Sequence, residues 1–150
     1  MKIISHRGNL NGRILEQENH PSYIQAAIDA GHEVEVDVWY ADGEYHLGHD
    51  FPQYKVYRTW LHEMKNVLWC HAKNVDAFQR MLAEGLHCFW HETDRYTLTS
   101  RGVPWCYPNN YIPWGITVMK NRPSDLPLLK NSLGVCTDYP IEWSNECTSH

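Results

Sequence analysis

The sequence predicts an α/β fold, a reduced (β/α)8 barrel in which several crossover helices are short or missing. About eight short apolar segments recur along the 150 residues, and helical patterns or loops separate them. Apolar strands with helical crossovers are typical of a parallel sheet covered on both faces. Eight such strands favour a barrel, with a doubly wound open sheet as the alternative. Such barrels usually need about 250 residues, so we expect several crossovers to be loops or single turns.

The expected elements follow in order along what we take to be a single domain, residues 1–150. A first helix begins within 18–22 and ends at Gly31, and Asn74 caps a second helix. Between them we expect one helical turn near 59–64, and after them a polar loop or hairpin at 94–102. A short helix at 124–130 and a polar, fraying tail at 141–150 complete the chain. The expected strands are 2–5, 32–38, 44–47, 66–70, 86–90, 103–107, 116–119 and 134–137.

One strand carries an unusual run of acids. Glu33, Glu35 and Asp37 alternate with three valines. On a β-strand this spacing places the carboxylates on one face and the valines on the other. Adjacent carboxylates repel one another unless water, a cation or a basic side chain lies between them. The alternation therefore indicates either a solvated strand face or a cation site.

Polar side chains follow most of the other expected strands where those strands end. In a parallel barrel the carboxyl ends of the strands open on one rim. Carboxylates with His suit a divalent cation: Mg²⁺ or Ca²⁺ if oxygen ligands dominate, Mn²⁺ or Zn²⁺ if His contributes more. Arg and Lys neutralise phosphate oxygens, and free His can exchange protons. The residues concerned are His6, Arg7, Glu35, Asp37, His49, Asp50, His71, Lys73, Trp90, His91, Glu92 and Asp138.

At these positions the chain resembles the glycerophosphodiester phosphodiesterases. The resemblance lies in an ordered set across residues 6–50: His6-Arg7-Gly8, Glu18-Asn19, Glu35-Val36-Asp37-Val38, Asp42-Gly43 and His49-Asp50. Later pieces are similar but looser: Lys73, Trp90, and the Thr-Asp-Tyr-Pro sequence at 137–140. The resemblance implies a TIM barrel and a bound divalent metal ion.

The resemblance also implies roles for individual residues. His6 and His49 would act as the acid/base pair, while Arg7 and Lys73 would bind phosphate. The metal ligands would be Glu35 and Asp37, and Glu18 would steady Arg7. Trp90 is expected to line the cleft, and Asp138 to orient a neighbouring site residue.

Two departures from the family pattern matter. The family's third metal carboxylate lies two residues before its Lys, and here that position is His71, which removes one negative charge. The family's capping insertion also has no room, because only residues 51–65 separate the His-Asp motif from the next strand. Recognition of the alcohol is therefore the least defined part of the expected site.

The expected function is metal-dependent hydrolysis of a small phosphodiester of the glycerophosphodiester type, as in lipid metabolism, with His acid-base catalysis. One alternative is a barrel that binds a phosphorylated ligand without turnover. A metal-independent lyase is a third possibility, but it would need a cationic side chain where Glu35 and Asp37 stand.

Composition narrows the remaining possibilities. The net charge of −5 disfavours binding to nucleic acid or an anionic membrane. No segment approaches the roughly 18 apolar residues of a membrane span, and the N-terminus resembles no signal peptide. Five cysteines without a CxxC pair indicate reduced, buried thiols and a cytoplasmic location. A barrel this thin could use a second copy to cover exposed strand faces, so a homo-oligomer stays open.

Overall fold

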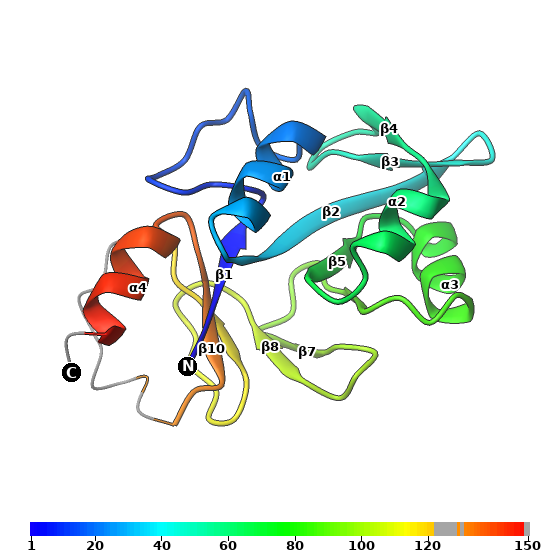
Figure 1. Ribbon diagram of the computed structural model, residues 1–150. Helices are drawn as coiled ribbons and strands as arrows, with labels where there is room; N and C mark the ends of the chain where they lie inside the picture. The colour runs from blue at the N-terminus through cyan, green and yellow to red at the C-terminus, as the bar shows by residue number, and fades with distance from the viewer. Residues whose placement is uncertain (122–128, 130, 149–150) are drawn as a thin grey trace.

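The computed structural model describes residues 1–121, 129 and 131–148, and shows a mixed α/β fold (Figure 1). The strands are β1 Lys2–His6, β2 Glu33–Ala41, β3 Glu44–Leu47, β4 Tyr54–Val56, β5 Leu68–Ala72, β6 Cys88–Trp90, β7 Tyr96–Leu98, β8 Pro104–Cys106, β9 Ile116–Val118 and β10 Gly134–Thr137. The helices are α1 Pro21–Asp29, α2 Arg58–Glu63, α3 Val75–Ala83 and α4 Pro140–Thr148.

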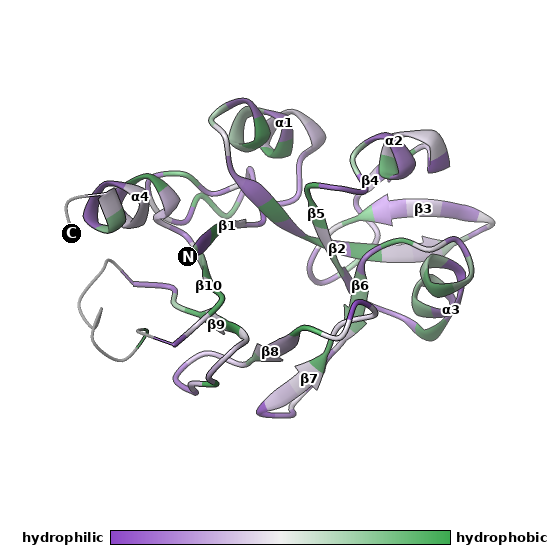
Figure 2. Cartoon of the chain, turned by 60° about the horizontal axis from the view of Figure 1, so that its bottom comes forward, coloured by the Kyte–Doolittle hydropathy of each residue, from purple (hydrophilic) through white to green (hydrophobic). Residues whose placement is uncertain are grey.

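The strands form one curled sheet, and most of it is parallel. The strands β6-β5-β2-β1-β10-β9-β8 lie side by side in that order, each parallel to its neighbours. Figure 2 shows the sheet curling around a central space, with the four helices outside the curve. The prediction of an α/β protein with a mainly parallel sheet and few helices is confirmed. The half-barrel curl is compatible with the reduced barrel expected above.

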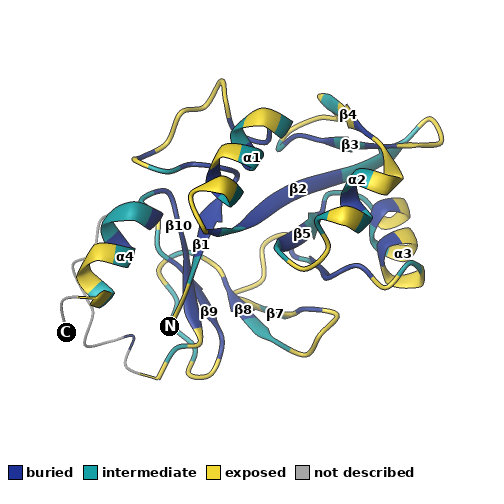
Figure 3. Cartoon of the chain, in the orientation of Figure 1, coloured by how far each residue is buried: buried dark blue, intermediate teal, exposed yellow. Residues whose placement is uncertain are grey.

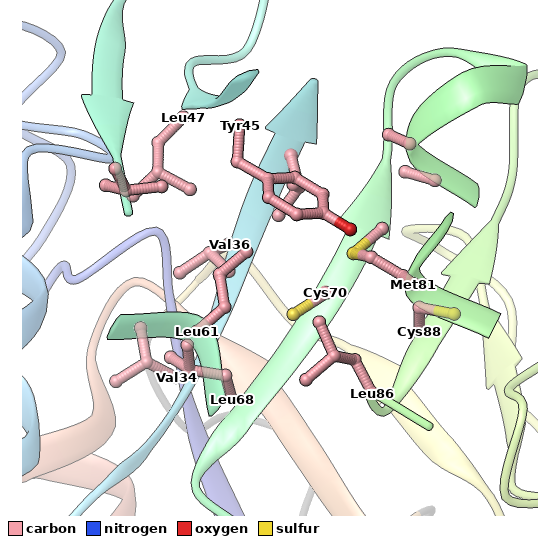
Figure 4. Packing of buried hydrophobic residues seen from close by; sticks show 14 of the residues in the cluster. Val34, Val36, Tyr45, Leu47, Leu61, Leu68, Cys70, Met81, Leu86 and Cys88 are labelled. Carbon is pink, nitrogen blue, oxygen red and sulfur yellow. The ribbon is translucent and has the colours of Figure 1, made fainter. Parts of the chain in front are cut away.

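Strand β2 separates the core from the site, as its alternation predicts. Val34, Val36 and Val38 are fully buried on the outer side. There they pack with side chains of α2, α3 and the neighbouring strands, including Leu61 and Met81 (Figure 4). The intervening acids point into the curl. Burial of a valine or leucine side chain stabilises a fold by about 1.5–3 kcal/mol, so this outer cluster anchors the strand that carries the acids.

A second cluster fills the inside of the curl. Trp69, Phe89 and Trp105 are almost fully buried there, and the ring centres of Phe89 and Trp105 lie 4.6 Å apart. Phe89 and Trp105 also line the cavity that holds the candidate site residues. The candidate site residues lie toward the carboxyl ends of the strands.

The helices are short and bury one face each, with exposed outer faces (Figure 3). Asn74 caps α3 as predicted, because its side chain accepts a hydrogen bond from Ala77 N. The predicted turn near 59–64 is helix α2. The segment expected as a loop or hairpin at 94–102 contains β7, which pairs antiparallel with β8.

Two predictions are wrong. The tail at 141–150 was expected to fray, but α4 covers residues 140–148 and buries Trp143 completely. A single buried ring anchors an otherwise polar helix, so the hydrophobic pattern of this segment is weak. The strand at 44–47 was expected in the parallel set, but β3 runs antiparallel to the second half of β2. The helix expected at 124–130 falls largely outside the described residues.

A buried histidine directly before β6 predicts acid sensitivity of the fold. Burial lowers the pKa of His87 to about 4, and only 5% of the residue is exposed. Between pH 6.5 and 4 the unfolded chain binds a proton at this position that the folded chain rejects, so stability falls as the pH falls. The shift corresponds to at most about 3 kcal/mol. We expect His87→Gln to flatten the pH dependence of the free energy of unfolding between pH 4 and 6.5. An unchanged slope, measured by urea unfolding, would contradict this assignment.

Candidate active site

The open end of the curled sheet holds a cavity of about 360 Å³. Side chains from six parallel strands (β1, β2, β5, β6, β8 and β9), or from the residues that follow them, line it together with the β3–β4 loop. Of the residues predicted as catalytic, metal-binding or supporting, seven line this cavity: His6, Arg7, Glu35, His49, His71, Lys73 and Trp90. Asp37, Glu18 and Asp138 are buried and contact these residues from behind. Segments far apart in the sequence thus meet at one place.

Glu35, Asp37 and His71 form a compact group with metal-ligand chemistry. One oxygen of each carboxylate and one ring nitrogen all lie within 4.8 Å of one another. His71 Nδ1 is 3.1 Å from Asp37 Oδ1 and 3.7 Å from Glu35 Oε1. Adjacent parallel strands produce this grouping, because Asp37 of β2 is in register with His71 of β5.

The second nitrogen of His71 determines what the first can do. His71 Nε2 lies 2.9 Å from the backbone carbonyl oxygen of His91, which can only accept a hydrogen bond. A neutral ring therefore carries its proton on Nε2 and turns the lone pair of Nδ1 toward the two carboxylates. Metal-bound histidines commonly donate their other N–H to a carbonyl in this way.

Two oxygens of this group need a partner. Glu35 Oε2 and Asp37 Oδ1 are buried, and neither accepts a hydrogen bond from any residue that the structure describes. An unsatisfied buried carboxylate oxygen is costly. Two such oxygens beside a nitrogen lone pair fit a divalent cation, because the ion would satisfy all three atoms.

The two carboxyl groups differ in their proton affinity. Burial and the charge of Asp37 raise the pKa of Glu35 well above its usual value. Burial would raise the pKa of Asp37 too, but its contact with the His71 ring and the charge of Arg7 hold it below its usual value. Asp37 is thus the fixed anion of the group, and Glu35 is the carboxyl group whose charge most needs a nearby cation.

Asn19 and Arg7 orient Asp37. Asn19 Nδ2 donates to Asp37 Oδ2 at 2.9 Å, and Asn19 Oδ1 accepts from the Asp37 backbone N–H at 2.9 Å. Arg7 Nε lies 2.9 Å from the same Oδ2, and its NH1 donates to Glu18 at 3.1 Å. Arg7 and Asn19 both adopt positive φ angles, 56° and 64°. Such strained backbone is often found at functional sites.

His6 is held by a second buried network. Its Nδ1 lies 2.7 Å from Asp138 Oδ1, which also accepts a hydrogen bond from Asn9. Nε2 of the ring lies 3.9 Å from Glu35 Oε2. Burial lowers the pKa of His6, although the hydrogen bond to Asp138 opposes this shift. Asp138 therefore orients the ring so that Nε2 faces the carboxylate group. His6, Glu18 and Asp138 also have metal-ligand spacing, but Arg7, Arg13 and Asn9 already bond this second group.

The antiparallel course of β3 brings His49 to the site. β2 extends past the sheet edge, and β3 returns until the Gly48 N–H donates to the Asp37 carbonyl oxygen. Trp39 Nε1 donates to the Gly48 carbonyl oxygen at 2.7 Å. Gly48 has a φ of 149°, and a Cβ there would lie 2.2 Å from Phe51 O, so no larger residue fits. The His49 side chain is 41% exposed and therefore accessible to a ligand.

Lys73 supplies the remaining charge. Its Nζ lies 3.7 Å from Asp37 Oδ1, and the side chain is 17% exposed. Lys73 thus places a positive charge beside the acidic group, on the cavity wall. The sequence did not predict a role in the site for four residues that help to build it or its walls: Asn9, Asn19, Trp105 and Tyr107. Asn19 had a usable signal, because it directly follows Glu18 in the motif.

Comparisons with protein-family models, with curated proteins and with solved structures found no match. The geometry of the site must therefore carry the interpretation. Among the described helices, none is long and apolar enough to cross a membrane. The fold and site together define an α/β protein whose curled sheet holds a buried group of two carboxylates and a histidine, flanked by two further histidines, an arginine and a lysine.

Proposed function

We propose that this protein hydrolyses a small phosphodiester of the glycerophosphodiester type with the help of a divalent cation. The observation that carries the proposal is the unsatisfied group of Glu35, Asp37 and His71, placed beside His6. We further propose that the curled sheet is a reduced TIM barrel, as the resemblance to the phosphodiesterase family implies.

The three residues fit a cation through their chemistry. Two orphaned carboxylate oxygens and one imidazole lone pair suit Mg²⁺ or Ca²⁺, and the nitrogen also admits Mn²⁺ or Zn²⁺. A bound cation supplies Lewis acidity, which draws charge from a phosphoryl oxygen and favours attack at phosphorus.

The protein's own side chains supply binding and proton transfer. Lys73 and the cavity-facing part of Arg7 attract the phosphate oxygens. One of His6 and His49 removes the proton of the nucleophile, and the other protonates the leaving alkoxide. Asp138 holds the His6 ring in one orientation, and Asp50 holds His49 through a 2.7 Å contact to Nδ1. In both rings Nε2 is then the nitrogen left to exchange a proton: the ring that acts as base begins neutral and accepts there, and the ring that acts as acid begins protonated and donates from there.

Hydrolysis of bis(p-nitrophenyl) phosphate and of glycerophosphodiesters tests the proposal. We expect turnover that stops in EDTA and returns with an added divalent ion. Turnover that persists after complete chelation would remove the cation from the mechanism. Activity of a Glu35→Gln variant equal to that of the wild type would remove the proposed site.

A second candidate function is binding of a phosphorylated ligand without turnover. It is favoured by the state of Arg7, whose charge is already balanced by Asp37 and Glu18. His71, which stands where the phosphodiesterase family has a third carboxylate, also leaves the acidic group with one negative charge fewer for a cation. Tight binding of a phosphate monoester together with no hydrolysis in Mg²⁺, Ca²⁺, Mn²⁺ or Zn²⁺ would favour this function over the first.

A further inference from the structure

The cavity extends beyond the acidic group along a wall of rings. Trp90, Trp105 and Tyr107 line this part, together with His91. These residues lie at the ends of β6 and β8, across the cavity from His6 and Arg7 of β1. The proposed cation and acid-base residues leave this part of the cavity without a role.

His91 is the unusual member of the wall. It is 8% exposed, and neither of its ring nitrogens has a hydrogen-bond partner in the described part of the chain. Buried polar atoms nearly always have a hydrogen-bond partner, so two nitrogens of one ring without any partner need an explanation. A neutral imidazole offers one donor and one acceptor. Its natural complement is a hydroxyl group, which can also donate and accept.

The position of His91 relative to the acidic group is fixed. Its backbone carbonyl accepts the hydrogen bond from His71 Nε2, and the two ring centres lie 6.2 Å apart. On its other side the His91 ring lies 5.1 Å from the ring of Tyr107. A substituent of a phosphate held at Glu35 and Asp37 would therefore extend toward His91 and lie along an aromatic face.

We propose that His91, with the ring of Tyr107, binds one alcohol group of the phosphodiester, and that this alcohol carries hydroxyl groups next to a short carbon chain or ring. The inference rests on the proposed binding of a phosphoryl group beside Glu35 and Asp37. Both nitrogens are buried in the structure, so binding requires rotation of the His91 ring about its Cβ–Cγ bond, a torsion that is soft for histidine.

Two matched ligands test the proposal by binding rather than by turnover. Glycerol phosphate and propyl phosphate differ only in hydroxyl groups, and calorimetry in Mg²⁺ gives both dissociation constants. We expect the wild type to bind glycerol phosphate about tenfold more tightly, which corresponds to one or two buried hydrogen bonds. His91→Phe keeps a ring but removes both nitrogens, and should bring the ratio of the two constants close to one. His91→Asn keeps a donor and an acceptor, and should retain part of the preference.

His46 provides the control. Its Nδ1 is also buried without a hydrogen-bond partner among the described residues, but His46 lies on β3 and is not part of the cavity wall. His46→Phe should leave the ratio unchanged. The proposal is overturned if the wild type binds both ligands equally or binds neither, or if His91→Phe weakens both by the same factor. Hydrolysis of bis(p-nitrophenyl) phosphate, which has no hydroxyl group, tests the proposed function separately. A wild type with the expected ratio but without turnover would refute hydrolysis and leave this subsite standing.

Discussion

Glu35→Gln is expected to abolish metal-dependent hydrolysis and to stabilise the metal-free protein at the same time. The side chain is 3% exposed, and one of its oxygens is unsatisfied within the described residues. Burial and the charge of Asp37 raise the pKa of Glu35, which means that the folded protein disfavours its anionic form. Glutamine has the same shape without the charge. In EDTA at pH 8 we expect a gain of about 1–2 kcal/mol in the free energy of unfolding, with activity reduced roughly 1000-fold.

Glu33→Gln is the matched control for this experiment. Glu33 lies on the same strand and the same face, but it pairs with Lys2 and accepts a hydrogen bond from Trp69 Nε1. Its replacement should bring no stabilisation and little loss of activity. If Glu35→Gln destabilises the metal-free protein as much as Glu33→Gln does, the two carboxylates are equivalent and no cation site is built around Glu35.

Replacement of the two histidines is expected to reveal their separate roles through the leaving group. His6→Ala and His49→Ala should each lower kcat on an alkyl phosphodiester roughly 100- to 10,000-fold. A p-nitrophenolate leaving group needs no proton, so loss of the general acid should matter much less with bis(p-nitrophenyl) phosphate. We therefore expect one of the two variants to recover most of its activity on that substrate, and the other to stay impaired on both.

His46→Ala is the control, because it removes a histidine from β3 without touching the cavity wall. It should leave kcat unchanged on both substrates. Equal and full activity of His6→Ala and His49→Ala would exclude acid-base catalysis by either ring. Both variants losing the same factor on both substrates would instead mean that the rings position the phosphate.

Much of the site could be predicted because strand periodicity is a local signal. The alternation around Val36 correctly separates the core face from the acidic face. The carboxyl ends of parallel strands meet at one edge of the sheet, and this rule correctly predicts that His6, His71 and Lys73 lie at one cavity. These inferences need only the element type and its direction.

The remaining features depend on tertiary contacts that leave little trace in the sequence. The Asp42-Gly43 turn indicates a hairpin, yet the parallel pattern elsewhere led to a parallel assignment for β3. Helix α4 forms because one ring, Trp143, finds a buried position. The unpaired nitrogens of His91 result from its surroundings, which no spacing rule describes.

Titration with Mn²⁺ followed by electron paramagnetic resonance tests the central claim most directly. We predict one bound Mn²⁺ per chain, with a hyperfine coupling between the ion and the Nδ1 nitrogen of His71. In His71→Glu the ion should still bind, because a third carboxylate replaces the ring, but the nitrogen coupling should disappear. Absence of a bound ion in the wild type, or a nitrogen coupling that persists in His71→Glu, would contradict a cation site at Glu35, Asp37 and His71.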